Sequence, residues 1–392
     1  MFDRKKGIKV KNIYIEHYKV LKNFKIDFCN KNNELLPIII LAGINGSGKT
    51  AILDSIAGIK KINGLKLKVM IDGKEKIFDS NSSGLSIGGN GIREFWYNDE
   101  IKDKILYFSY NIDLRHIKEF LPEYIQKLVF EYDIKASEVY AKIRENINNI
   151  FKDMELNIEF DSRDAKGNIF FRHKNTKEKI LIDNLSSGER TLVSEILFLY
   201  LNNIKNMIIL IDEPELSLHP AWQNRVLKLY ENFAKENNSQ IIIATHSPHI
   251  IGSAKNEWVR VLTEDGAIDN FSQSYGLEFS KVLTDIMGVN NLRTPDIEKD
   301  FKYIKQEIYS NNYRNNPKFE TIWKHLEENL ESNDIDLNSL RDDFELMKKM
   351  IFSYKNIDKE EFKKAWDRLE KKLGKSDLDL KLLRLEMKMR DR

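Results

Sequence analysis

The sequence contains a single cysteine, Cys29, among 392 residues. One thiol excludes a disulfide within the chain and any zinc site built from cysteines, so its simplest role is that of a small apolar filler. No stretch approaches the run of about 18 apolar residues that indicates a membrane-spanning helix. The first residues also lack the apolar core of a signal peptide. These absences predict a cytoplasmic protein without a membrane segment.

A large net charge is absent as well. Lys and Arg number 63 and Asp and Glu number 61, which gives a formal net charge of +2. This balance excludes a global basic field for nucleic acid, although a local basic patch stays open. Hydrophobic residues make up 41% and charged residues 32% of the chain, as in a folded protein rather than a membrane or disordered one.

Apolar runs of strand length alternate with stretches of helical periodicity, which predicts an α/β fold with a mixed or parallel sheet. Continuous apolar runs predict strands buried on both faces, at residues 37–42, 105–108, 207–211 and 240–244. The helices expected between them span residues 49–60, 186–202 and 221–237. Period-two alternation over residues 8–28 predicts an antiparallel hairpin, and similar alternation over residues 156–182 predicts further strands.

Glycine becomes rare after Gly288, since only Gly374 follows it. Apolar side chains recur in this region at the spacing of amphipathic helices. They are Phe301, Ile304 and Ile308; Leu340, Phe344, Met347 and Ile351; and Phe362, Trp366, Leu369 and Leu373. We therefore predict a head at residues 1–270, with a helical and β insertion at about 112–182, followed by an all-α domain at residues 271–392.

The most specific motif is Gly43–Thr50, which reads G-x-x-x-x-G-K-T between a predicted strand and a predicted helix. Its glycines let consecutive backbone N–H groups surround phosphate oxygens, and the helix N-terminus adds its positive dipole end. Lys49 would reach the β- and γ-phosphates of ATP, and the Thr50 hydroxyl would ligate Mg²⁺. The predicted nucleotide-binding residues of this motif are Asn45, Gly46, Ser47, Gly48, Lys49 and Thr50.

Polar residues follow two of the predicted buried strands. Asp212 and Glu213 end the first, where a carboxylate would lie beside the phosphate loop. Asp212 suits Mg²⁺, directly or through water, and Glu213 suits orienting or deprotonating an attacking water. His246 ends the second strand and could hydrogen-bond the γ-phosphate from there. A helix cap is the structural alternative for either acid, and a strand-terminal histidine is by itself more often structural.

A fourth element begins the helix predicted from residue 186. A serine at the first position and a glutamate three residues later match a capping box. The same N-terminus, with free N–H groups and serine hydroxyls, is also an anion site. Its residues are Ser186, Ser187, Gly188 and Glu189. Both interpretations stay open from the sequence.

The order of these four elements resembles that of ABC-type P-loop ATPase heads. The segments Asp212–Pro220 and Ala244–Pro248 are similar to AAA-family ATPases close to the overcoming-lysogenization-defect nucleases and RecF-type proteins, and Ile13–Phe28 is similar to their first hairpin. This resemblance covers about residues 8–265. It implies an ABC-type head with an antiparallel β subdomain, and a head-to-tail dimer that sandwiches two ATP molecules. Ser186–Glu189 would then contact the γ-phosphate held by the other subunit.

A narrower resemblance rests on Tyr275–Gly288 and Arg293, followed by a helical tail. These features are similar to stand-alone ATPases of bacterial antiphage defence, including Septu-type and retron-associated ATPases. This resemblance implies an ATP- and Mg²⁺-dependent regulatory or sensor subunit that controls a separate effector, an HNH-type nuclease. Assembly beyond the dimer and contact with nucleic acid are further expectations, and no membrane partner is expected.

The sequence departs from ABC heads in two places: no glutamine lies near residues 107–111, and Ser187 stands where glycine is common, a change that this branch tolerates. Ser109 or Asn111 could take the place of the usual glutamine of the loop that links the two lobes.

Three other functions compete with the defence subunit. The main alternative is a DNA-repair ATPase of the RecF or SMC kind that clamps DNA, but the insertion at residues 51–184 leaves no room for a long coiled coil. A transporter ATPase is disfavoured by the missing glutamine and by Leu216–Pro220. A fused nuclease is disfavoured because the region after residue 290 is helical and shows no acidic or H-N-H cluster.

Overall fold

The computed structural model describes residues 7–58, 62, 64–80, 104–108, 114–131, 133–164, 166–202, 204–263, 266–268, 275–289, 292–310, 312–314 and 316–352. The chain divides into two compact units, residues 1–289 and 290–392. The division falls after Val289, so residues 275–289, which the sequence analysis assigned to the helical domain, are counted with the head.

A six-stranded sheet forms the centre of the first unit, with strand order β13-β12-β3-β11-β10-β6. Its strands are β3 (Ile38–Ala42), β6 (Ile105–Phe108), β10 (Ile208–Asp212), β11 (Gln240–Ala244), β12 (Val259–Thr263) and β13 (Gly266–Ile268). Every pair from β12 to β6 is parallel, and only β13 runs antiparallel to its neighbour. All five residues of β3 and of β11 are buried, as expected of strands covered on both faces. The predicted α/β fold is confirmed.

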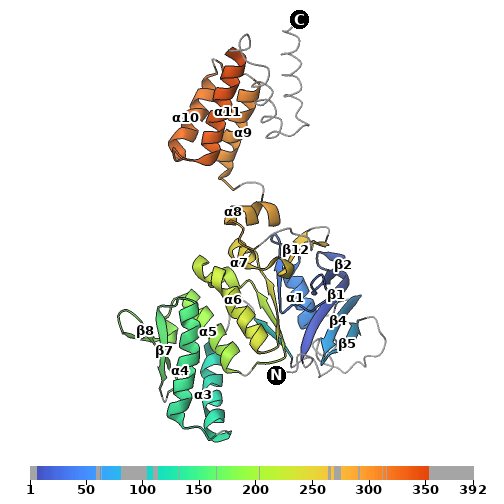
Figure 1. Cartoon of the computed structure of the whole chain (residues 1–392), viewed down its shortest axis with the longest axis vertical. Coiled ribbons are helices and arrows are strands. Elements are labelled where there is room, and N and C mark those ends of the chain that lie inside the picture. The colour runs from blue at the N-terminus through green and yellow to red at the C-terminus, as the bar shows by residue number, and fades with distance from the viewer. Residues whose placement is uncertain are drawn as a thin grey trace. The chain divides into compact units, whose positions relative to one another are not determined.

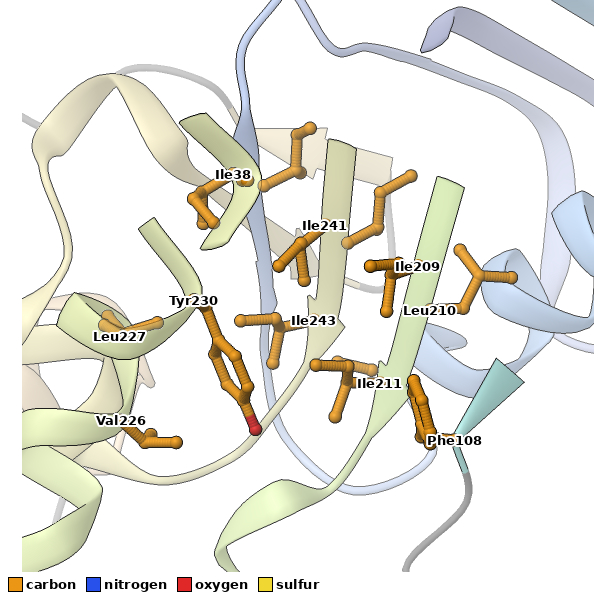
Figure 2. Close-up of a cluster of buried hydrophobic side chains, with 14 of the residues drawn as sticks. Ile38, Phe108, Ile209, Leu210, Ile211, Val226, Leu227, Tyr230, Ile241 and Ile243 are labelled. Carbon is orange, nitrogen blue, oxygen red and sulfur yellow. The ribbon is translucent and has the colours of Figure 1, made fainter. Parts of the chain in front are cut away.

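Helices cover the two faces of this sheet. They include α1 (Lys49–Ala57), α5 (Ser187–Leu201), α6 (Pro220–Glu236) and the short α7 (Pro248–Ser253). Figure 1 shows α1 and α6 on opposite sides of the sheet. Figure 2 shows Tyr230 of α6 beside the isoleucines of β11, with Phe108 at the far side of β10. Helix α1 ends before the predicted Lys60, because Gly58 adopts a left-handed conformation with φ 67°.

A four-stranded antiparallel sheet, ordered β2-β1-β4-β5, confirms the predicted hairpin and extends it. Its strands are β1 (Ile8–Tyr18), β2 (Leu21–Asp27), β4 (Leu65–Ile71) and β5 (Lys74–Asp79). Buried Gln240 ties this sheet to the central one, since its side chain accepts from the Val10 N–H at 2.6 Å and donates to the Val10 carbonyl at 3.1 Å. Cys29 is buried, and burial raises the pKa of its thiol to about 11, in keeping with a filler role.

The insertion contains two helices and a small antiparallel sheet, as predicted. Its elements are α3 (Leu114–Glu131), α4 (Ala136–Asp153), β7 (Ile158–Arg163), β8 (Ile169–His173), β9 (Lys179–Leu181) and a 3-10 turn, η1 (Ile182–Asn184). One stripe of α4 is fully buried, including Val139, Ile147 and Phe151. The Phe151 ring lies 5.9 Å from the Phe171 ring of β8, so the helix and the sheet share one core.

Short helical turns complete the first unit: the 3-10 turns η2 (Pro214–Ser217) and η3 (Asn256–Trp258), α8 (Phe279–Lys281) and a π-helical turn, η4 (Val282–Ile286). Within the described ranges, no helix combines the length and the apolar character needed to cross a bilayer.

The second unit is helical in its described part, with α9 (Pro295–Tyr309), α10 (Pro317–Asn329) and α11 (Ile335–Phe352). The predicted stripe of Phe301, Ile304 and Ile308 is buried in a separate core together with Phe319 and Leu326. The stripe predicted at residues 362–373 and Gly374 lie outside the described residues, as do Ser109 and Asn111.

Candidate functional site

The phosphate-loop motif connects β3 to α1. Gly43 and Gly48 have φ values of 149° and 99°, which L side chains rarely adopt. A Cβ at Gly43 would come within 2.7 Å of the Leu262 carbonyl oxygen, and one at Gly48 within 2.6 Å of the Leu21 side chain. The loop therefore depends on glycine at both ends, one before the turn and one at the start of the helix.

Lys49 begins α1 and is only 5% exposed. Its ammonium group donates to the carbonyl oxygens of Gly43 at 2.9 Å and Ile44 at 3.1 Å. Burial lowers the pKa of Lys49, and the charges of nearby acids, Glu213 first, oppose that change. The buried ammonium group of Lys49 is therefore held by backbone carbonyl oxygens of the phosphate loop.

Asp212 ends β10 and lies next to the start of α1. Its two carboxylate oxygens accept hydrogen bonds from the Thr50 hydroxyl at 3.2 Å and from the Tyr107 hydroxyl at 3.1 Å. Burial raises the pKa of Asp212, while these two hydrogen bonds lower it. A threonine hydroxyl beside a carboxylate offers the oxygen ligands that Mg²⁺ prefers.

Glu213 has a left-handed backbone, with φ 52°, which is uncommon for a residue other than glycine and recurs at functional sites. Its N–H donates to the Ala244 carbonyl at 2.8 Å, which holds the turn against β11. Its carboxylate lies 4.0 Å from the Lys49 ammonium group. Burial, and then the neighbouring Glu215 carboxylate, raise the pKa of Glu213 to about 8.

His246 follows β11 and faces the same carboxylate. Its Nδ1 lies 2.5 Å from Oε2 of Glu213. Among the described residues, neither atom has a hydrogen-bond partner. The backbone N–H of His246 donates to Oε1 of Glu215 at 2.8 Å, so a second acid supports its position.

Several buried polar atoms at the site have no hydrogen-bond partner within the described residues. They are Ser47 Oγ, Glu213 Oε2, Glu215 Oε2 and His246 Nδ1. Buried polar atoms are normally paired, so such a group indicates a place for a polar ligand or water. Ser47, the glycine loop and the buried Lys49 fit the triphosphate of a nucleotide, and Thr50 with Asp212 fits its metal ion.

A cation could also lie between Glu213, Glu215 and His246, whose ligand atoms are all within 4.8 Å of one another. Lys49 already supplies a positive charge 4.0 Å from this group. The cluster lies at the ends of β10 and β11, next to the loop that follows β3.

Ser186 caps α5 as the sequence predicted. Its hydroxyl accepts from the Glu189 N–H at 3.3 Å, and its own N–H donates to the Glu189 carboxylate at 3.2 Å, which completes the capping box. In the described part of the chain, the side chains of Ser186 and Glu189 form no hydrogen bond or ion pair with the phosphate loop.

The structure therefore brings together Lys49, Thr50, Asp212, Glu213 and His246, because β3, β11 and β10 are adjacent and parallel and their carboxyl ends meet at one edge. Three further residues were given no role from the sequence: Tyr107 and Glu215, which contact this group, and Thr245, whose hydroxyl donates to Glu215. Glu215 could have been suspected from the sequence, because it is the second glutamate of Asp-Glu-Pro-Glu and lies two residues after Glu213. Nothing local marked the other two.

Comparison with known proteins gives one family match and several relatives. An AAA ATPase domain matches residues 96–251, which hold the capping box, both acids and His246. The chain resembles a defence-associated AAA ATPase. The Septu protein PtuA of Bacillus mycoides is 25% identical over 298 residues, 65% of this chain and 40% of the relative.

A retron Vc95 probable ATPase of Vibrio cholerae is 34% identical over 92 residues, 21% of this chain and 18% of the relative. The chain thus aligns with less than half the length of either relative. Among solved structures, the SMC head domain from Thermotoga maritima aligns at a TM-score of 0.40 and 17% identity, covering 65% of this chain and 95% of that one.

Proposed function

We propose that this chain binds and hydrolyses ATP with Mg²⁺ as the regulatory subunit of an antiphage defence complex, and that it controls an effector on a separate chain, an HNH-type nuclease. The observation that carries the ATPase part is the meeting of Lys49, Thr50, Asp212, Glu213 and His246 at one edge of the sheet. The defence part is supported by the similarity to Septu and retron ATPases.

Each residue of the site would have a separate role in ATP binding or hydrolysis. Lys49 and the loop N–H groups would bind the β- and γ-phosphates, and Thr50 and Asp212 would hold Mg²⁺, which neutralises phosphate charge when bound. Glu213 would orient the attacking water and accept its proton. Burial raises the pKa of Glu213 above its ordinary value, and this direction favours a carboxylate that takes up a proton. His246 would donate to the γ-phosphate.

A second copy of the chain would complete each site. Ser186–Glu189 would act as an anion site toward the nucleotide of the other subunit, as the ABC-type resemblance implies. Two exposed apolar side chains near the loops support such a contact: Ile44 is 49% exposed and Leu216 is 56% exposed.

Two variants test the ATPase assignment. Lys49→Ala should weaken ATP binding by at least about tenfold, because it removes a charge-assisted contact. Glu213→Gln should keep ATP binding and lower kcat by about 100-fold or more, because it keeps the side-chain shape and removes the base. Equilibrium ATP binding and steady-state phosphate release measure the two effects.

Glu195→Gln provides the matched control, because Glu195 is a buried acid that lies outside the site. It should leave ATP binding and turnover unchanged. Normal turnover by Glu213→Gln would contradict the role given to Glu213, and unchanged binding by Lys49→Ala would contradict the nucleotide site itself.

A further inference from the structure

Glu215 is an acid with no direct place in the chemistry above, yet it is the most buried acid of the site, at 8% exposure. Its Oε1 accepts two hydrogen bonds from the end of β11, from the Thr245 hydroxyl at 2.7 Å and from the His246 N–H at 2.8 Å. The same oxygen lies 3.6 Å from Nδ1 of His246. One carboxylate oxygen therefore fixes the backbone and faces the ring of the histidine that points at Glu213.

The contacts of Glu215 continue into a closed ring of hydrogen bonds. The Thr245 hydroxyl accepts from the Ser247 N–H at 2.9 Å, and the Ser247 hydroxyl donates to the Gln223 side chain at 2.6 Å. The amide of Gln223 then donates to the carbonyl oxygens of Glu215 at 3.4 Å and Leu218 at 2.8 Å. The ring joins η2, the end of β11 and the first turns of α6 and α7.

This arrangement has a physical consequence for the site. Thr245, Ser247 and Glu215 are all buried, so a lost acceptor would leave donors without partners in a region that water does not readily reach. The His246 turn would then move to find other acceptors, and its ring would move with it. Catalytic groups lose about 100-fold in rate when displaced by about 1 Å.

We propose that Glu215 is a positioning residue for ATP hydrolysis, which holds His246 against Glu213 through the hydrogen bonds of its Oε1. This inference rests on the proposed function. In this role Glu215 acts through Thr245 and the backbone of His246, to which its Oε1 is hydrogen-bonded.

Three substitutions distinguish the effects of the Glu215 acceptor oxygen, the Glu215 charge and the Thr245 donor. Glu215→Ala removes the acceptor and should lower kcat at least about tenfold, with KM for ATP within about threefold, since phosphate binding by Lys49 and the loop is untouched. Glu215→Gln keeps an oxygen at the same position and should retain kcat within about threefold. Thr245→Val removes one of the two donors and should give an intermediate loss.

A control is needed because any buried acid could matter for folding alone. Glu195→Ala is matched, since Glu195 is 4% exposed and its carboxylate also accepts from a hydroxyl, that of Tyr230 at 2.8 Å. It should change thermal stability without changing kcat. Equal kcat losses in Glu195→Ala and Glu215→Ala would show a structural role only and would overturn the proposal.

A second readout does not depend on turnover. The chain has seven histidines, so ¹⁵N-histidine spectra of the full chain are simple enough to assign His246 by comparison with His246→Gln. Glu215→Ala should shift the His246 ring signals and leave those of His325, a residue of α10 in the second unit, in place, whereas Glu215→Gln should restore the His246 signals. An unmoved His246 signal in Glu215→Ala overturns the inference. If the wild-type chain does not hydrolyse ATP, but Glu215→Ala still shifts the His246 signal, the result contradicts the ATPase function and not the positioning role.

Discussion

Buried acids of this protein differ in how their charge is balanced. Glu231 is 6% exposed and its Oε1 lies 2.5 Å from the ammonium group of Lys235 and 2.6 Å from that of Lys255. Although burial raises its pKa, these two lysines lower it, and the lowering is larger. Glu195 is equally buried but meets only the hydroxyl of Tyr230 among the contacts described, so burial raises its pKa to about 7. A charge without a counter-ion is thus costly at Glu195.

Glu195 should make stability depend on pH. Its folded-state pKa, about 7, lies above its ordinary value of 4.5, so the folded protein binds the extra proton between these values. Stability therefore falls as pH rises from about 5 to 8, because the folded state must then bury a charge. Since one unit in pKa corresponds to about 1.4 kcal/mol, the loss can reach about 3 kcal/mol.

Glu195→Gln removes this dependence and keeps an acceptor for Tyr230. Urea unfolding at pH 5, 6, 7 and 8 should show that the free energy of unfolding of the variant rises relative to that of the wild type as pH rises. A constant cost of the buried amide would not change this trend. A stability difference that is the same at every pH would show that Glu195 does not titrate in this range.

At the scale of elements, the site is assembled from the carboxyl ends of strands and the N-termini of helices. The loop after β3 and the residues that end β10 and β11 meet because these strands are parallel neighbours. The N-terminus of α1 starts at Gly48 without a side-chain cap and adds backbone donors, whereas the N-terminus of α5 carries the Ser186–Glu189 capping box. The trans role of that second terminus stays a prediction, and its test needs two subunits.

Mixing two inactive variants tests whether α5 serves the other subunit. Lys49→Ala disables the loop, and Ser186→Arg disables the cap, so each homodimer has two dead sites. A mixed dimer would carry one site with both elements intact and should recover ATPase activity. If mixed dimers form and remain inactive, the sites are built within one chain.

Helix α10 offers an element-scale test in the second unit. The Asn316 side chain accepts from the N–H groups of Lys318 and Phe319 at 3.1 and 3.2 Å, as an N-cap does. Asn316→Ala should lower the stability of this unit by about 1 kcal/mol. ATP turnover should be unaffected, and a matching loss of kcat would show that the helices take part in the reaction.

At the scale of the whole molecule, two units carry two separate cores. The first unit holds the complete set of nucleotide-site residues. The second buries its own cluster, in which the rings of Tyr313 and Phe344 lie 4.9 Å apart. Because the proposed nucleotide site lies wholly in the first unit, we propose that the second unit serves assembly with the effector or with further copies.

Removing residues 290–392 tests this assignment. The truncated head should retain ATP binding, since every nucleotide-site residue and its core remain. It should lose co-purification with the protein encoded beside this chain in its native genome. A folded head that still recruits that protein with full affinity would place docking on the first unit.

The sequence alone determined the alternation of strands and helices and the identity of the phosphate loop, because these depend on spacings of a few residues. It also placed Asp212, Glu213 and His246 at strand ends, and parallel pairing then brought them together. In the region after residue 290, the spacing of Phe301, Ile304 and Ile308 was enough to predict a buried helix face.

Tertiary structure decided the contacts that join distant parts of the chain. Tyr107 donates to a carboxylate 105 positions away, and Glu215 accepts from Thr245, 30 positions away. No local pattern encodes such pairs, because hydrogen bonds across strands depend on which strands become neighbours. The raised pKa of Glu195 has the same origin, because this acid of α5 is buried only when distant parts of the chain pack over it; the hydrogen bond from Tyr230 of α6 opposes that rise.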